Sequence, residues 1–233
     1  WKVEVQDNWT EWGLVPGMMG RKRLVYPHLY GGRTRYLSAR NILGDETNKE
    51  GREIKAYNLP AALAGERQAY FNHAYGSRAE SCLLVEGQAD ALTLAQWDLP
   101  ALALAGTSWQ DHEALMQELR KRHQVIYIGM DADEAGMQAL IGREKDWPLV
   151  KFFGPMARVA VWPGQETKDA NDWLQKLVEE GAAPEEQRER VNRRLAAART
   201  LAEHAAMWAG ALDGAAKDAA FSTVFAIIGG MSA

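Results

Sequence analysis

The stretch CLLVEGQADALTLAQW, residues 82–97, decides the fold of this sequence. Its first part, 82–86, is a continuous apolar run that ends in an acid, which is typical of a strand buried on both faces. Its second part, 89–97, repeats apolar residues at the period of an amphipathic helix. The stretch therefore predicts a strand that is followed at once by a helix, the repeating unit of a parallel sheet.

The same alternation continues three more times along the chain. Further strands are expected at 101–106, 124–131 and 157–163, and further helices at 111–122, 134–145 and 169–180. Strands that alternate with helices of this length favour a parallel sheet with helices on both faces. The fold class is therefore α/β, with a parallel four-stranded sheet and flanking helices.

The pattern differs on either side of this region. Residues 21–29 and 33–42 alternate in polarity around the turn signal Tyr30-Gly31-Gly32, which predicts an antiparallel hairpin, and a short extended piece is expected at 54–60. Beyond Glu180 the chain is rich in Ala, Arg and Glu, which predicts two helices up to about Lys217. We expect three parts: a small basic mixed α/β subdomain at 1–79, the α/β domain at 80–178, and a helical segment at 179–233.

Composition excludes several classes of protein. The 233 residues are 47% apolar, enough for a core, yet no run of about 18 apolar residues predicts a membrane span. The N-terminal sequence lacks the pattern of a signal peptide. The single cysteine, Cys82, excludes a disulfide framework and a zinc site built from cysteines of this chain, and favours a cytoplasmic location. Because the sequence starts at Trp1 rather than Met, we expect a fragment of a longer protein.

Charge is distributed unevenly along the chain. Residues 20–78 contain eleven Lys and Arg against five acids, whereas residues 79–178 contain nine against fifteen. A basic part beside an acidic part suits a protein that holds a polyanion with the first and metal ions with the second. An uneven distribution over solvated faces is the alternative explanation.

Acidic residues stand where the predicted strands end. Glu86 closes the first strand, and Asp131 and Asp133 close the third. Asp169 follows the fourth strand. Ligands of an open α/β sheet bind outside the carboxyl ends of its strands, and Mg²⁺ prefers carboxylate oxygens. Each acid alone is better explained as a helix cap or an exposed charge, but together they predict a metal site.

Two of these motifs resemble those of the Toprim family. LLVEGQADAL, 83–92, resembles the family's Glu-containing motif, and IGMDADEAG, 128–136, resembles its Asp-x-Asp motif, over about residues 80–178. The family includes primases, topoisomerases, nucleases and recombination proteins. The resemblance implies a protein that works on nucleic acid, and for most members metal-dependent phosphoryl transfer.

Segments outside these motifs resemble the catalytic core of bacterial-type DNA primases and of related phage helicase-primases. They are RLVYP at 23–27, GRTRYLSAR at 32–40, KAYNLP at 55–60, AGTS at 105–108 and KDAND at 168–172. The resemblance implies a DNA-directed RNA polymerase, a nucleotidyltransferase that makes short primers from nucleoside triphosphates on single-stranded DNA. A replicative helicase is a further expected partner. The family's zinc module has no counterpart in this sequence, so no zinc is expected in this fragment.

Roles for individual residues follow from that resemblance. Catalytic roles are implied for Glu86, Asp131 and Asp133. Ligands for two or more Mg²⁺ or Mn²⁺ ions are implied to be Glu86, Asp131, Asp133 and Asp169. Residues expected to support these ligands are Asp90, Asn171 and Asp172. Residues expected to bind nucleic acid or nucleotide are Arg23, Arg40, Lys55 and Lys168.

Other Toprim activities remain open at this point. A Toprim nuclease would keep the acids but lack the basic hairpin that precedes them. A topoisomerase would need a nucleophilic tyrosine, and no tyrosine here has an identifying context. A recombination-type module would bind nucleic acid without catalysis, which the intact Glu86, Asp131 and Asp133 argue against.

Overall fold

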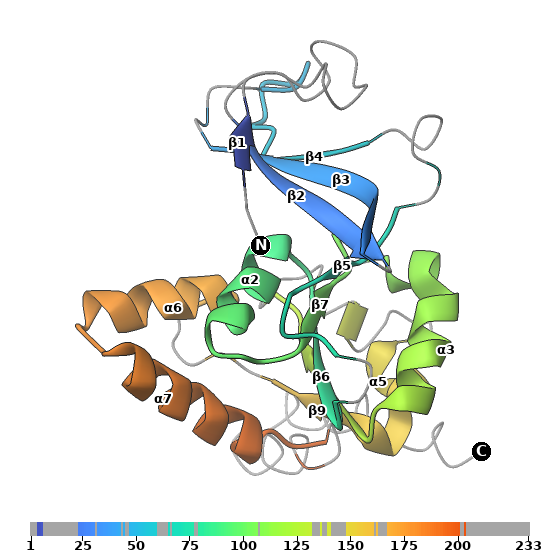
Figure 1. Cartoon of the computed structure of the whole chain (residues 1–233), viewed down its shortest axis with the longest axis vertical. Helices are drawn as coiled ribbons and strands as arrows, with labels where there is room; N and C mark the ends of the chain where they lie inside the picture. The colour runs from blue at the N-terminus through green and yellow to red at the C-terminus, as the bar shows by residue number, and fades with distance from the viewer. Residues whose placement is uncertain are drawn as a thin grey trace, which may run out of the picture. The chain divides into compact units, whose positions relative to one another are not determined.

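The computed structural model describes only part of the chain (Figure 1). The described residues are 4–6, 23–30, 32–42, 44, 47–59, 65, 67–76, 79–106, 108–131, 136, 139–140, 148–160, 162, 167–200 and 203. The chain forms two compact units, Trp1–Phe71 and Asn72–Ala233. Within the described ranges, no helix has the length and apolar character needed to cross a bilayer.

An antiparallel sheet forms the first unit. Its strands are β1 (Glu4–Gln6), β2 (Arg23–Tyr30), β3 (Arg33–Asn41) and β4 (Ala56–Asn58), in that order across the sheet. The predicted hairpin is confirmed as β2 and β3, which pair from Arg23↔Asn41 to Tyr30↔Arg33. The pairing of β1 with β2 was not predicted. The elements described in this unit are all strands, so the helical part of the expected mixed subdomain stays a prediction.

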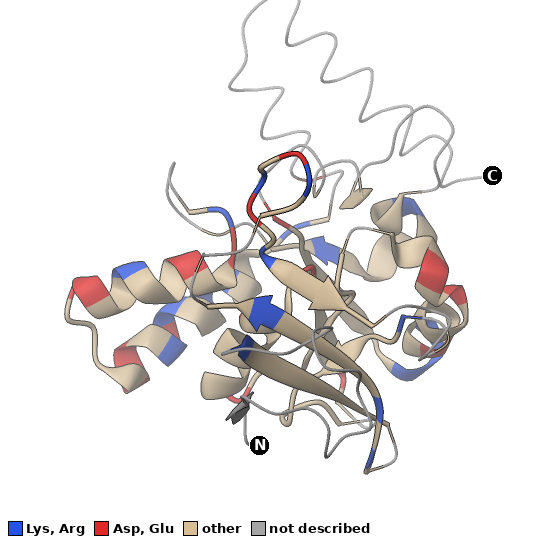
Figure 2. Ribbon diagram, turned by 90° about the horizontal axis from the view of Figure 1, so that it is seen from above, with Lys and Arg blue, Asp and Glu red and all other residues tan. Residues whose placement is uncertain are grey.

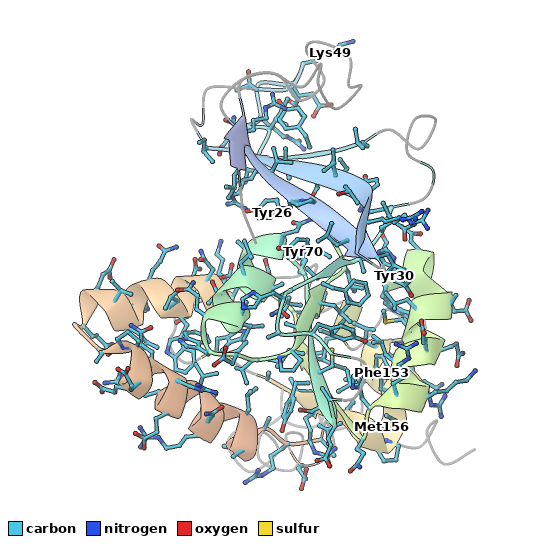
Figure 3. All side chains as sticks on the ribbon, viewed as in Figure 1. Tyr26, Tyr30, Lys49, Tyr70, Phe153 and Met156 are labelled. Carbon is cyan, nitrogen blue, oxygen red and sulfur yellow. The ribbon has the colours of Figure 1, made fainter. Side chains whose placement is uncertain are left out.

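Both faces of this sheet carry buried side chains. Val25, Leu37 and Ala39 form a small core, with Tyr57 and Leu59 packed against it. On the opposite face, His28 Nε2 lies 2.8 Å from the Ser38 hydroxyl. Tyr26, on this second face, meets Tyr70 of β5 (Tyr70–Phe71) edge to face (Figure 3). Both faces are therefore structured, and neither is a simple solvated surface.

The second unit contains the predicted parallel sheet. Its parallel strands are β6 (Ser81–Val85), β7 (Ala101–Ala103), β8 (Val125–Gly129) and β9 (Ala157–Val159), in the order β7-β6-β8-β9. The side chains from Cys82 to Val85 are at most 1% exposed, as the apolar run predicted. The α/β fold with four parallel strands is confirmed. The domain limits at 79/80 and 178/179 stay predictions.

Helices cover both faces of this sheet. They are α2 (Gln88–Gln96), η2 (Trp109–His112), α3 (Glu113–Arg122), α5 (Leu149–Phe153), η3 (Gly154–Met156), α6 (Ala170–Glu179) and α7 (Pro184–Ala197). Figure 1 places α2, α6 and α7 on one side and α3 and α5 on the other. The short α5, with its side chain Phe153 labelled in Figure 3, was not predicted. Of the helix expected at 134–145, Gly136, Ala139 and Leu140 are helical, and the rest lies outside the described residues.

The helical segment after Glu180 is interrupted. Helix α7 ends at Ala197, and Ala198 is extended, with φ −63° and ψ 137°. Arg199 then forms an isolated antiparallel bridge with Val159 of β9, so its backbone extends the sheet edge. The expected second helix up to Lys217 lies almost entirely outside the described residues.

Candidate metal centre

Asp90 reaches the end of β6 because a glycine precedes it. Gly87 is the N-cap of α2, and Asp90 lies in the first turn of that helix. A Cβ atom on Gly87 would lie 2.8 Å from Asp90 Oδ2, closer than real Cβ contacts allow. The missing side chain therefore makes room for the Asp90 carboxylate, which is only 5% exposed.

Asp131 is placed by the end of β8. The strand ends at Gly129, and Asp131 follows two residues later with a half-buried side chain. The helical Gly136 approaches the Asp131 backbone so closely that an added Cβ would overlap the Asp131 carbonyl oxygen. The sequence signal of a glycine shortly after the acid therefore has a steric cause.

Asp169 is held at the N-terminus of α6. It is the N-cap residue, and its Oδ1 accepts a hydrogen bond of 2.7 Å from the Asp172 backbone N–H. Asp172 in turn accepts a bond of 3.3 Å from the Lys168 N–H. These two bonds satisfy backbone donors at the helix start. Asp169 thus has a structural role besides its position near the other acids.

Three of these side chains meet. One carboxylate oxygen each from Asp90, Asp131 and Asp169 lies within 4.8 Å of the other two. They come from the ends of β6, β8 and β9, or from the helices that follow, at the carboxyl edge where an open α/β sheet binds ligands. Three clustered carboxylates are the donor set that Mg²⁺ or Mn²⁺ takes, so the residues fit such an ion.

The electrostatics of the group centre on Asp90. Burial raises the pKa of Asp90 well above its ordinary value, and the nearby Asp169 and Asp131 raise it further. A hydrogen bond of 3.1 Å from the Asn171 backbone N–H to Asp90 Oδ1 opposes this shift. Like charges this close favour the protonated form of Asp90 in the metal-free protein, and a bound cation would displace that proton.

Comparison with known proteins agrees with this geometry. Residues 83–174 match the family model described as Toprim-like. This segment is a Toprim-like domain. No curated protein sequence matched the chain.

Solved structures show a related fold. The Aquifex aeolicus primase (zinc-binding and RNA polymerase domains) aligns with 88% of this chain at 19% identity and a TM-score of 0.56. The present chain spans only about half of that chain, 51%. The primase fragment of the bacteriophage T7 primase-helicase aligns with 69% of this chain and 62% of its own at 21% identity and a TM-score of 0.44. The first likeness shows a shared fold.

Two of the four predicted metal ligands of the Toprim-like domain lie together in the structure. Asp131 and Asp169 lie in the three-carboxylate group, as their positions at strand ends suggested. Asp90, expected only as a supporting residue, contributes the third carboxylate. Glu86 is half-buried at the end of β6 and is not one of the three, and Asp133 lies outside the described residues. The metal-binding roles of Glu86 and Asp133 stay predictions.

The supporting residues tie two helices together behind the group. Asn171 donates its backbone N–H to Asp90, and its side-chain oxygen accepts a bond of 3.2 Å from Thr93 of α2. Further along both helices, Trp97 and Trp173 meet edge to face at 6.2 Å. The helices that carry Asp90 and Asp169 are therefore packed against each other, which fixes the spacing of these two acids.

The four basic residues that were predicted to bind nucleic acid or nucleotide have different surroundings. Arg23 is 2% exposed, and its guanidinium stacks 3.4 Å above the Tyr57 ring. Arg40 is exposed and pairs with Leu24 and Ala56, so alternation places it on the opposite sheet face from Arg23. Lys55 and Lys168 are exposed, and Lys168 precedes Asp169. Arg23 and Arg40 therefore cannot line one surface of the sheet.

The raised pKa of Asp90 predicts how stability depends on pH in metal-free protein. Above the ordinary value of 3.8, the unfolded chain has lost this proton while the folded chain keeps it. The folded state therefore loses stability as pH rises, until the pH passes the pKa of folded Asp90. Asp90→Asn removes that loss because the amide stays neutral and can donate to Asp169. We therefore expect the free energy of unfolding of Asp90→Asn to exceed that of wild type by a difference that grows above pH 4. The growth is at most about 1.4 kcal/mol per pH unit.

Urea unfolding in EDTA at a series of pH values measures this difference. The exposed Asp111→Asn is the matched control and should show no such slope. A constant difference between Asp90→Asn and wild type from pH 4 to 8 would show that Asp90 is ionised in the folded protein.

Asp169 and Asp172 are expected to respond differently to replacement by asparagine. Asn caps helices as well as Asp does, so Asp169→Asn keeps the cap but loses a metal-ligand charge, and more Mn²⁺ should be needed for half-maximal binding. Asp172→Asn loses a negative charge in the first turn of α6, at about 0.3–1 kcal/mol of stability. Calorimetric Mn²⁺ titration and thermal melts of both variants test the pair. A metal-binding defect confined to Asp172→Asn would show that Asp172, and not Asp169, is the ligand.

Proposed function

We propose that the chain is the catalytic core of a DNA primase. It would make short RNA primers from nucleoside triphosphates on single-stranded DNA, in a metal-dependent, template-directed reaction. The observation that carries the proposal is the group of Asp90, Asp131 and Asp169 at the carboxyl edge of the Toprim-like sheet. The shared fold with the Aquifex aeolicus primase supports it, as do the primase-like segments at 23–27, 32–40 and 55–60.

The residues of the site suit phosphoryl transfer, which needs positioning and charge neutralisation above all. Asp90, Asp131 and Asp169, with Asp133 as a further proposed ligand, would hold Mg²⁺ or Mn²⁺. When bound there, two such ions would supply activation of an attacking hydroxyl and charge stabilisation for the leaving pyrophosphate. The half-buried Glu86, which follows β6, would accept the 3′-hydroxyl proton or serve as another ligand.

Exposed basic residues are proposed to bind the nucleic acid and the nucleotide. Arg40, Lys55 and Lys168 are exposed and would contact template or nucleotide phosphates. The buried Arg23 would act by holding Tyr57 and the sheet in place. The parts 1–79, 80–178 and 179–233 would be the basic subdomain, the catalytic domain and a helical extension. A replicative helicase is a further proposed partner.

One assay tests the proposal directly. The chain is incubated with single-stranded DNA, labelled ribonucleotides and Mg²⁺ or Mn²⁺, with EDTA and template-free reactions as controls. New short RNA products that require template and metal would support a primase. Loss of template without new products would instead identify a Toprim nuclease. Binding of the template with neither product would identify a module without catalysis.

A further inference from the structure

The Toprim-like unit also has a pocket between two of its helices. Helix α7 follows α6 after a short connection, and the two helices lie next to each other (Figures 1 and 2). They line a pocket of about 540 Å³. The residues around it are Trp173, Lys176, Glu180, Arg190, Arg193, Arg194 and Ala197.

Arginines of α7 line most of one side of the pocket. That helix contains four arginines and three glutamates, and the pocket is lined by Arg190, Arg193 and Arg194 but by none of the glutamates. The fourth arginine, Arg188, instead pairs with Asp98 at 3.0 Å. The lining that α7 contributes to the pocket is therefore mainly basic.

The charges around the pocket are partly paired. Arg190 bonds to Glu180 at 2.7 Å and to Glu186 at 2.6 Å, which joins the two helices, and its single charge offsets one of these two carboxylates. Lys176, Arg193 and Arg194 add three positive charges around the same space. Arg193 lies 3.9 Å from Glu189, at a highly exposed position where such an ion pair is weak. With Glu186 and Glu189 included, four cations stand against three acids, so the charge around the pocket is positive by one.

We propose that this α6–α7 pocket binds the phosphate backbone of single-stranded nucleic acid. Arg190, Arg193 and Arg194 lie within about one helical turn, about 6 Å along α7, so neighbouring phosphates of a bound nucleic-acid strand would meet more than one of them. Trp173, at the pocket, is one turn beyond Asp169 on α6. The proposal rests on the proposed function, since the strand bound here would be the template or the primer.

Binding of a fluorescein-labelled oligo(dT) strand, followed by anisotropy over a series of salt concentrations, tests this site. Arg193→Ala/Arg194→Ala is expected to weaken binding about 25-fold at 0.1 M salt and to lower the salt slope by about 1.4, from about 0.7 per lost contact. Arg193→Lys/Arg194→Lys keeps both charges and should keep the slope. Arg188→Ala is the matched control: it also removes one arginine of α7, outside the pocket, and should change neither quantity.

The outcomes separate the site from the proposed function. Equal binding by Arg193→Ala/Arg194→Ala and Arg188→Ala, or no binding by wild type, would overturn the pocket even if primers are made. The expected loss of binding in a chain that makes no primers would support the pocket and refute the primase. If the double variant melts early, Lys176→Ala replaces it, with an expected decrease in slope of about 0.7.

Discussion

Asp131→Ala is expected to reduce primer synthesis by about a thousandfold or more at saturating Mg²⁺, while the protein remains folded. Metal ions supply several kcal/mol of charge stabilisation in phosphoryl transfer, and each 1.4 kcal/mol is a factor of ten in rate. Asp131 contributes one of three carboxylates within 4.8 Å of one another, so its loss removes a proposed ligand that its neighbours cannot replace. Asp133→Ala is expected to have the same effect on activity.

The stability of the same variant separates this explanation from simple misfolding. Asp131 is one of the charges that raise the pKa of Asp90, so its removal relieves repulsion in the metal-free protein. The melting temperature of Asp131→Ala in EDTA should equal or exceed that of wild type. Asp111→Ala, an exposed acid on η2, is the control and should keep full activity. Near-normal turnover of Asp131→Ala under saturating Mg²⁺ would remove Asp131 from the metal site.

Those parts of the fold that depend on local pattern were predictable from the sequence. Alternating polarity predicted the β2–β3 hairpin, and continuous apolar runs predicted the parallel strands. Both patterns are local, because the residues of a strand determine which of its faces can be buried. The five-residue α5 was not predictable, since an apolar run of that length carries no helical period. The extended break at Ala198 depends on pairing between Arg199 and Val159, a contact distant in sequence.

The candidate site was predictable at the strand ends but not on the helices. Asp131 follows β8, and Asp169 lies at the N-terminus of the helix that comes after β9, so their convergence follows from the parallel topology. Asp90 joins them because α2 packs on α6 through Trp97 and Trp173, and because Gly87 leaves space for its carboxylate. An acid in the first turn of a helix usually only interacts favourably with the helix dipole. The position of Asp90 in the sequence therefore could not reveal that it joins the metal site. The α6–α7 pocket likewise requires the tertiary arrangement of two helices.

Gly136→Ala is expected to abolish activity through the backbone rather than through charge. A Cβ atom at this position would overlap the Asp131 carbonyl oxygen and lie 2.9 Å from the Asp131 nitrogen, and neither atom can rotate away as a side chain can. Forcing a methyl group into such a contact costs about 1–3 kcal/mol of stability, and the required shift moves Asp131 away from Asp90 and Asp169.

Two alanine variants calibrate that result. Gly76→Ala meets nothing within 4 Å and should behave as wild type in thermal melts and in Mn²⁺ titration. Gly87→Ala meets only the end of the Asp90 side chain, which can rotate, so it should raise the Mn²⁺ requirement with little loss of stability. Gly136→Ala should show both defects, because its contact is with the backbone that positions Asp131. If Gly136→Ala instead melts and binds Mn²⁺ as Gly76→Ala does, the close approach of this glycine does not position the acid.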